Sequence, residues 1–504
     1  MRGRLDPRRL DWHSPELTAA AVALVLGGLH LLLRPRTGTD IAAQIARASF
    51  ADAYPFIPVD LSWYGGVHPY GYSLLAPYVM NVVGIGLTGL AAAVAASVLL
   101  GRLLRATAHP RAGAALGAFF AVANVVSGRT TFALGAVAAL AALVLLPRRL
   151  LAAVAAVLSG LFSPVAAAFL GLAAAVLVLR RRPGGWTVGL AASVPVVALG
   201  VLFPSGGIQP YEAASAPYAV LAGLVLAALT HSSLLRTGGL LYAGTAGWLV
   251  LMSDPFGSNI LRLGLLLAAP LVVATATEHW RLVAPITAVL VLWQVQPPYA
   301  DLRAARPPSF VALNQALIDQ QVKRVEVVPL RDHGEAAFVA PVVPLARGWS
   351  RQIDTARNDL FYDGALAAQE YEQWLRDNGV DAVALGPSTL ADGGGRAERA
   401  LLLVGSVNGL QKTWSDGQWT LFRFSPAEPI ADLPVEVLAT DRISVRLRSP
   451  VATEVALKVR WSRWLAVTGP ACVERAGGGT RVRFTGPGEV VVSSQLSLRP
   501  VGHC

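Results

Sequence analysis

Charged residues are scarce in this chain of 504 residues. They make up only 14% of it, whereas soluble domains contain roughly a quarter. Hydrophobic residues make up 54%, and the mean hydropathy is +0.52. A wholly soluble protein is therefore excluded, because so much apolar surface needs lipid around it.

Lysine is almost absent, so the net charge of +11 comes from arginine. The arginines stand mainly at the ends of apolar segments, which is typical of membrane topology rather than of nucleic-acid binding. We therefore expect membrane lipids, and no nucleic acid, as partners. The bias toward alanine, glycine and arginine also resembles that of high-GC bacteria such as actinobacteria.

The motifs of common soluble enzymes are missing as well. The chain has no G-x-x-x-x-G-K-[ST], no H-E-x-x-H and no C-x-x-C, which argues against a P-loop enzyme and a zincin. Its two cysteines, Cys472 and Cys504, lie in the polar C-terminal part. In an oxidising compartment they would form a disulfide, which is the prediction we favour over two free thiols.

Apolar segments fill residues 17–295 and predict an α-helical polytopic membrane protein. We expect about eleven helices, although several segments are shorter than the roughly 20 residues of a full crossing. Ser163-Pro164 interrupts one long apolar stretch and predicts a break there. Arginines between the segments share one side with the N-terminal Arg2, Arg4, Arg8 and Arg9; they are Arg102, Arg105, Arg111, Arg148, Arg149, Arg180, Arg181, Arg182, Arg236 and Arg281.

The positive-inside rule makes that side cytoplasmic. The chain is then a multi-pass protein of a bacterial plasma membrane, with its N-terminus in the cytoplasm and its C-terminal domain outside. Arg34 and Arg36 depart from the rule, and they would reach toward lipid headgroups or find a partner on the outer side.

Composition divides the chain into three parts. Residues 1–300 form the expected transmembrane domain, with a long external first loop at 35–73, and a proline-rich linker follows. Residues 301–425 combine short apolar runs with a helical pattern, which predicts an α/β domain. Residues 426–504 alternate polar and apolar residues between turns, which predicts a β-sandwich.

The first loop carries most of the candidate chemistry, and long loops are often functional. Asp40 could act as a general base or bind a divalent metal, or it could cap a short helix. Asp60 could be a second acid or a turn residue. His68 could be a base, a ligand or a hydrogen-bonded interfacial residue. Trp63 and Tyr64 could stack on sugar rings or belong to an aromatic membrane belt.

Two arginines complete the candidate residues. Arg129 lies in SGRTTF and Arg262 in GSNILRLG, each near the expected outer end of a helix. A guanidinium binds phosphate through its fork of donors, and a helix N-terminus adds backbone N–H groups. The alternative is that both side chains reach out to headgroups.

The layout resembles the GT-C superfamily of integral membrane glycosyltransferases. The shared features are a first helix, a long external loop with an early acid, a fan of about ten more helices and an external C-terminal domain. The stretches DLSWYGGVHPYGYSLLAP, SGRTTFALG, DPFGSNILRLG and RGWSRQIDTARNDLFYDG are similar to a group of actinobacterial membrane proteins.

The resemblance implies transfer of a sugar from a polyprenyl-phosphate donor to a cell-envelope glycan or lipid. It assigns Asp40 as the base or as a ligand of Mg²⁺ or Mn²⁺, Asp60 as a second acid, and Arg262, with Arg129, as the holder of the carrier phosphate. The family's adjacent acidic pair is absent, because Asp40 stands between Thr39 and Ile41. A multi-pass transporter and a non-enzymatic envelope scaffold, or degenerate GT-C relative, are the alternatives.

Overall fold

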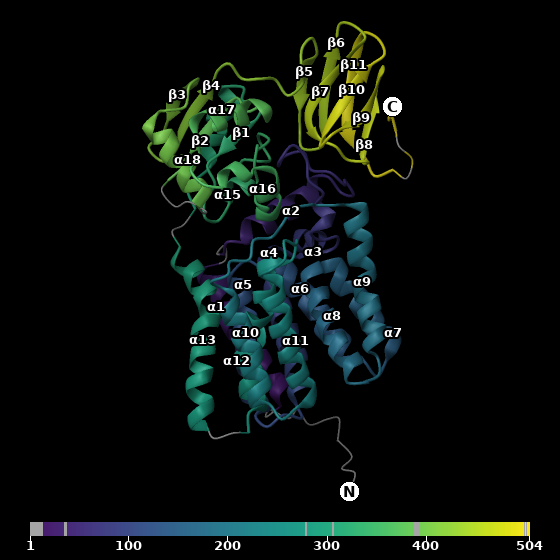
Figure 1. Ribbon diagram of the computed structural model, residues 1–504, viewed down its shortest axis with the longest axis vertical. Helices are drawn as coiled ribbons and strands as arrows, with labels where there is room; N and C mark the ends of the chain where they lie inside the picture. The colour runs from purple at the N-terminus through teal and green to yellow at the C-terminus, as the bar shows by residue number, and fades with distance from the viewer. Residues whose placement is uncertain are drawn as a thin grey trace. The chain divides into compact units, whose positions relative to one another are not determined.

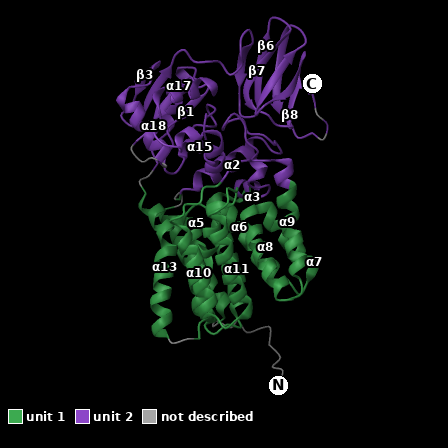
Figure 2. Cartoon of the chain, in the orientation of Figure 1, with its two compact units in different colours: residues 1–38, 82–198, 209–304 green, residues 39–81, 199–208, 305–504 purple. Residues whose placement is uncertain are grey.

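The computed structural model describes residues 14–34, 38–277, 280–304, 307–387, 393–497, 499 and 501–504. The topological predictions for Arg2, Arg4, Arg8, Arg9 and Arg36 therefore lie outside the described residues. The chain divides into two compact units (Figure 2). Unit 1 comprises Met1–Gly38, Val82–Ala198 and Gln209–Ala304; unit 2 comprises Thr39–Asn81, Leu199–Ile208 and Ala305–Cys504.

Unit 1 is built from apolar helices (Figure 1). They are α1 (Pro15–Leu33), α4 (Ile85–Leu104), α5 (Pro110–Val126), α6 (Thr130–Val144), α7 (Arg149–Phe162), α8 (Pro164–Leu179), α9 (Gly185–Leu202), α10 (Ala216–Leu229), α11 (Ser233–Leu249), η2 (Gly257–Ile260), α12 (Leu261–Thr275) and α13 (Trp280–Arg303). Among the described residues, five helices are long and apolar enough to cross a membrane: α1, α4, α9, η2 with α12, and α13. The structure thus supports membrane association through apolar helices.

The packing within unit 1 places small side chains inside and large apolar ones outside. Ala19 and Ala23 of α1 are fully buried against α4 and α5, whereas Leu24, Val25 and Leu29 on the same helix are about half exposed. Small residues allow close approach of helix backbones in membranes, where lipid rather than water surrounds the outer face. The predicted break at Ser163-Pro164 is confirmed: Ser163 ends α7 and caps α8.

Unit 2 contains an α/β part followed by a β-rich part. A four-stranded sheet has the order β1-β2-β4-β3, formed by β1 (Val325–Val327), β2 (Ala382–Leu385), β4 (Thr420–Phe424) and β3 (Leu410–Ser415). β1 and β2 run parallel, and the other pairs are antiparallel. Helices α14 (Val311–Asp319), α15 (Gly334–Phe338), α16 (Arg351–Arg357), α17 (Ala368–Asp377) and α18 (Gly393–Val404) belong to the same part.

The β-rich part consists of two antiparallel sheets. One has the order β7-β10-β9, from β7 (Thr453–Arg460), β10 (Gly479–Phe484) and β9 (Ala471–Ala476). The other has the order β5-β6-β11-β8, from β5 (Glu436–Thr440), β6 (Ser444–Ser449), β11 (Gly488–Ser494) and β8 (Leu465–Thr468). Burial alternates along β6 and β10, as the sequence pattern predicted. A disulfide joins Cys472 to Cys504.

Two segments differ from the sequence interpretation. Pro297 and Pro298 lie within α13, which continues to Arg303, so the start of the expected linker is helical. The first loop, which we counted with the transmembrane region, groups with unit 2 instead. There it forms α2 (Ile41–Ala53), η1 (Pro69–Gly71) and most of α3 (Ala76–Val83).

The first loop is part of the core of unit 2. Ala42, Ala46 and Trp63 pack in one apolar cluster with residues of the α/β part. The amide of Leu61 donates to the carbonyl of Arg442, 2.8 Å away. Residues 39–81 therefore contact both parts of unit 2 and belong to its packed structure.

Candidate functional site

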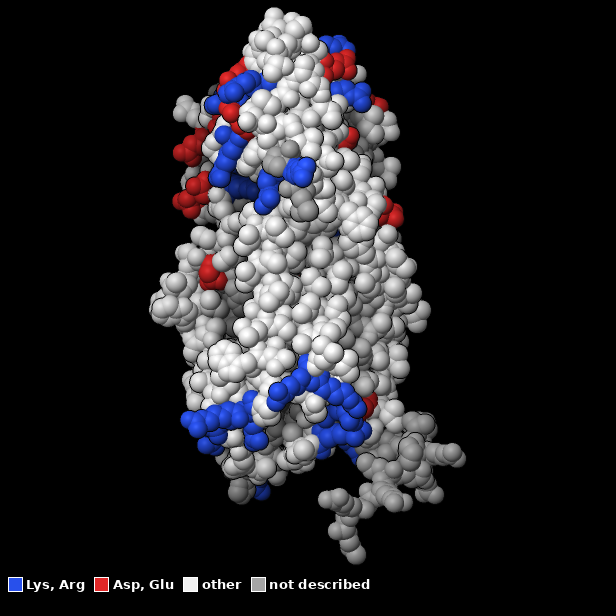
Figure 3. Space-filling model, turned by 90° about the vertical axis from the view of Figure 1, so that its right-hand side faces the viewer, with Lys and Arg blue, Asp and Glu red and all other residues white. Residues whose placement is uncertain are grey.

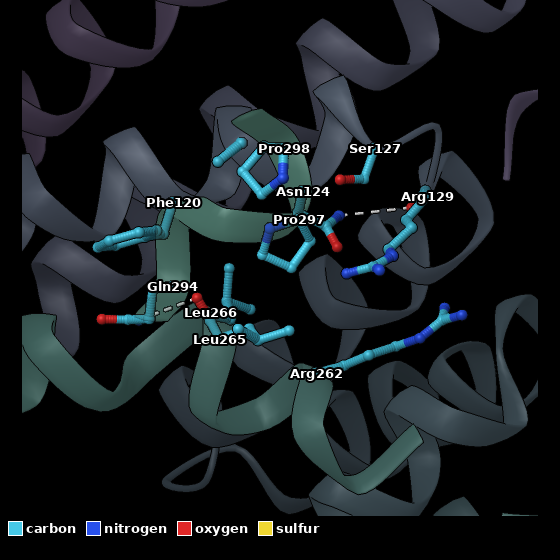
Figure 4. Close-up of a pocket in the computed structure, with 11 residues that line it drawn as sticks. Phe120, Asn124, Ser127, Arg129, Arg262, Leu265, Leu266, Gln294, Pro297 and Pro298 are labelled. Carbon is cyan, nitrogen blue, oxygen red and sulfur yellow. Dashed lines mark hydrogen bonds between the residues drawn. The ribbon is translucent and has the colours of Figure 1, made fainter. Parts of the chain in front are cut away.

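A pocket in unit 1 brings together the two arginines that the sequence singled out (Figure 4). It encloses about 290 Å³ of space, including space open to solvent. Its lining consists of Phe120, Ala123, Asn124, Ser127, Arg129, Arg262, Leu265, Leu266, Gln294, Pro297 and Pro298. The lining thus combines two cations, a few neutral polar groups and apolar side chains, and it contains no acidic residue.

The turn between α5 and α6 positions Arg129. The amide of Gly128 donates to the carbonyl of Val125, and the amide of Arg129 donates to that of Asn124. Asn124 in turn donates from Nδ2 to the carbonyl of Arg129 at 3.4 Å. Gly38 packs so closely on Ser127 and Gly128 that a Cβ there would overlap their backbone. The base of the Arg129 side chain is therefore held tightly.

A capped turn positions Arg262, the second residue of α12. Asp254 accepts hydrogen bonds at Oδ1 from the amides of Phe256 and Gly257, at 2.7 and 3.0 Å. These two hydrogen bonds fix the turn that leads into η2 and α12. The Arg262 guanidinium lies 5.8 Å from the ring centroid of Phe132.

Gln294 has a structural role in the wall of the pocket, because its amide binds backbone groups of α12. Its Nε2 donates to the carbonyls of Gly264 and Leu265, and its Oε1 accepts from the amide of Ala269. Pro270 lies within α12 and cannot donate to that helix. The Gln294 amide therefore satisfies backbone groups beside an interruption of the helix.

The electrostatics of the pocket favour an anion. Arg129 is the N-cap of α6 and Arg262 lies in the first turn of α12, and helix N-termini carry partial positive charge. The hydroxyl of Ser127 is buried and has no hydrogen-bond partner among the described residues. Figure 4 shows this hydroxyl turned toward the interior of the pocket. Guanidinium, hydroxyl and amide donors together suit phosphate oxygens.

Asp40 belongs to unit 2, at the start of α2. It occupies the N-cap position, but its side chain makes no capping hydrogen bond, so the helix-cap alternative is not realised. The side chain is half-buried. Neighbouring contacts hold its backbone: Trp349 donates from Nε1 to the carbonyl of Thr39 at 3.2 Å, and Gln44 donates to the carbonyl of Asp40 at 3.3 Å.

Asp60 lies in a structural environment. It is only 5% exposed, and its Oδ1 accepts from the amide of Ser62 at 3.0 Å and from the hydroxyl at 2.5 Å. Its Oδ2 pairs with Nη2 of Arg442 at 3.2 Å. The carboxylate is thus occupied by protein partners, which favours a role in folding over the second catalytic acid that we predicted.

The aromatic residues Trp63 and Tyr64 are core residues. Trp63 donates from Nε1 to the carbonyl of Ala336 at 3.2 Å, and the Tyr64 hydroxyl donates to that of Gly348 at 2.6 Å. Burial raises the pKa of Tyr64 well above its ordinary value, so this hydroxyl stays protonated. Both rings are almost fully buried, and neither presents a face on which a sugar could stack.

His68 is a hydrogen-bonded residue, the third of the alternatives that we considered. Its Nδ1 lies 2.8 Å from the carbonyl of Pro204 and its Nε2 lies 2.9 Å from Oγ of Ser462. Nδ1 must therefore carry the proton that it donates, while Nε2 accepts from the hydroxyl. Burial lowers the pKa of His68, which keeps the ring neutral and its role structural.

The sequence reasoning missed several residues that the structure makes important. Ser127 and Asn124 lie two and five positions before Arg129, so their place in the same turn was the available signal. Arg442 pairs with Asp60, which lies 382 residues away in the chain, and no local sequence pattern predicts this pairing. Within the described ranges, no three His, Cys, Asp or Glu side chains group as a metal site would require. Searches of protein-family models and of curated proteins gave no match to this chain.

Proposed function

We propose that this protein is a GT-C-like membrane glycosyltransferase and that the pocket of Arg129 and Arg262 holds the phosphate of its polyprenyl-phosphate donor. The observation that carries the proposal is the lining of that pocket: two arginines, the buried hydroxyl of Ser127 and no acid. Such a set of donors stabilises negative charge best where water is largely excluded.

In the proposed reaction, an acceptor hydroxyl of a cell-envelope glycan or lipid attacks C1 of the sugar. The bond between C1 and the phosphate oxygen breaks, and the polyprenyl phosphate leaves with the electron pair. Arg129 and Arg262 stabilise the charge that develops on this leaving group. We assign to Asp40, on the basis of the sequence, the removal of the hydroxyl proton or the binding of Mg²⁺ or Mn²⁺. Asp60 has no part in the step.

The proposal includes a topology. About eleven crossings would place residues after 299 outside a bacterial plasma membrane and the N-terminus in the cytoplasm. The disulfide between Cys472 and Cys504 supports this side for unit 2, because disulfides persist in oxidising compartments.

Sugar transfer by purified membranes tests the proposal. The donors are radiolabelled hexoses and pentoses on polyprenyl phosphate, with envelope extract as the acceptor. We expect Arg262→Gln and Arg129→Gln each to lower the rate about 100-fold, as loss of one charge-stabilising donor does elsewhere. Asp40→Asn should abolish transfer. Arg446→Gln, an exposed position on β6, is the matched control and should transfer normally.

The result that would overturn the proposal is unchanged transfer by both pocket variants. A wild-type chain that transfers no sugar but still requires unit 2 in the cell would favour the envelope scaffold. That alternative draws support from the first loop, because Asp60, Trp63, Tyr64 and His68 all hold unit 2 together. A multi-pass transporter would instead move its substrate across proteoliposome membranes without a covalent product.

A further inference from the structure

A cluster of five arginines lies at one end of unit 1, outside the pocket described above. Arg148 and Arg149 lie in the turn from α6 to α7, and Arg180, Arg181 and Arg182 in the turn from α8 to α9. The two turns are neighbours, because a Cβ on Gly184 would touch the side chain of Leu146. All five side chains are exposed. Figure 3 shows basic side chains gathered across this end of unit 1.

No acidic residue from these helices balances the cluster. The sequence contains neither aspartate nor glutamate between Asp60 and Glu212, so α4 to α9 carry arginine as their only strong charge. No ion pair joins any of the five arginines to another residue in the described part of the chain. Charge of one sign, without internal compensation, suits an external anion.

Helix stability does not explain the cluster. Arg148 and Arg149 lie at the N-terminus of α7, where the helix dipole disfavours cations and favours anions. Arg181 follows Arg180, the C-cap of α8, and has a φ of +51°. The amide of Arg182 donates to the carbonyl of Leu177 and that of Arg181 to Val178, which is the Schellman pattern that usually places glycine at this position. The chain thus keeps a charged side chain where its backbone would prefer glycine.

The surroundings of the cluster match a lipid rather than a soluble anion. Trp186, the second residue of α9, is 69% exposed, and Leu150 and Leu179 beside the arginines are also exposed. Farther along α9, Leu190, Val194 and Val197 continue this apolar surface. Exposed tryptophan between a basic rim and an apolar helix face is typical of a membrane interface.

We propose that this five-arginine cluster binds the phosphate headgroup of an anionic phospholipid, whose acyl chains lie along the exposed faces of α7 and α9. Arg180, Arg181 and Arg182 supply the charge from one turn. The N-terminus of α7, with Arg148 and Arg149, supplies it from the other. The site is separate from the pocket of Arg129 and Arg262, and it does not depend on glycosyl transfer.

Binding of single lipids to the purified full chain tests the site. The probes, measured by native mass spectrometry in a neutral detergent, are phosphatidylglycerol, phosphatidylcholine of the same chain length, and inorganic phosphate. We expect phosphatidylglycerol to bind at least tenfold more tightly than phosphatidylcholine. Replacing Arg180, Arg181 and Arg182 by glutamine should lower the affinity for phosphatidylglycerol about 100-fold, because each arginine contributes about fivefold. Arg446→Gln should change nothing.

Arg181→Gly separates lipid binding from folding. Glycine relieves the left-handed backbone, so the lipid-free variant should melt about 1–2 °C higher than wild type. Its affinity for phosphatidylglycerol should nevertheless fall about fivefold. The proposal fails if the two lipids bind alike, if the variants keep full affinity for phosphatidylglycerol, or if inorganic phosphate competes as well as the lipid does.

Discussion

The arginines of the two units have different surroundings. In unit 2, Arg347 is 3% exposed and is surrounded by carboxylates: Glu326 accepts from its Nε and Nη2 at 2.9 and 2.6 Å, Glu398 accepts from Nη2, and Asp354 lies 3.8 Å away. In unit 1, Arg129 and Arg262 line a pocket whose other residues are all uncharged. Removing one partner of a buried ion pair destabilises the fold, whereas arginines that line a pocket beside neutral donors suit an anionic ligand.

Removing Arg347 should give the largest effect on stability. Arg347→Met leaves two buried glutamates without their cation, which costs about 3–5 kcal/mol when a buried ion pair loses one partner. The measurement is chemical unfolding of the purified full chain in detergent. Fluorescence of Trp374, whose ring packs near Arg347 and Tyr371, reports on this region.

The matched control is Arg448→Met. The Arg448 side chain is 52% exposed and pairs with Glu489 on the sheet surface, so its loss should cost far less than the loss of Arg347. Equal losses in the two variants would mean that burial does not distinguish these ion pairs, and the contrast between the units would lose its basis.

The ion pair between Asp60 of the first loop and Arg442 also tests how much a buried pair contributes to stability. Asp60→Leu should destabilise unit 2 by about 3 kcal/mol, because Arg442 is left buried without its carboxylate. Arg442 also stacks at 4.8 Å on Phe50, which limits the loss. Adding Arg442→Met should restore most of the stability, because apolar replacement of both partners removes the unpaired charge.

A catalytic Asp60 would behave differently. Sugar transfer would stay absent in the double variant even though its folding had recovered. Recovery of transfer together with stability would instead establish Asp60 as a structural residue. The measurements are thermal unfolding and transfer assays on the same preparations.

Local sequence patterns predicted those features that depend on neighbouring residues: the apolar helices, the strands and a helix break. Hydrophobicity predicted the apolar helices, and alternation predicted the β-rich C-terminal part. The break at Ser163-Pro164 was predicted because it depends on adjacent residues. The helix starts around Arg129 and Arg262 led to the prediction that each binds phosphate, and the structure places both arginines in one pocket.

Long-range pairing was not predictable from one sequence. The acids and aromatic residues of the first loop resemble an active-site set in composition. Their partners in the structure are Arg442, Ala336, Gly348 and Ser462, hundreds of residues later. Nothing near Asp60 indicates that Arg442 will neutralise it, so a buried structural acid and a catalytic acid look the same at this level.

The pH dependence of unfolding gives the smallest and most specific test. Burial raises the pKa of Glu326 and Glu398 above 4.5, and Arg347 opposes this shift. The shift persists because one arginine cannot neutralise both glutamates and Asp354. Above pH 4.5 the folded protein thus keeps a proton that the unfolded chain has released. Stability must then fall as pH rises from 4.5 toward the raised folded pKa, by at most about 1.4 kcal/mol per pH unit for each proton.

Glu398→Gln should flatten this decline, because the remaining glutamate then pairs with Arg347 alone. Glu489→Gln, which removes an exposed carboxylate on the sheet surface, should leave the slope unchanged. Below pH 6.5 the half-buried His68 has the opposite effect on stability: its lowered folded pKa makes stability fall as pH falls. A His68→Gln background therefore isolates the glutamates, and a flat profile in that background would show that the network around Arg347 carries no extra proton.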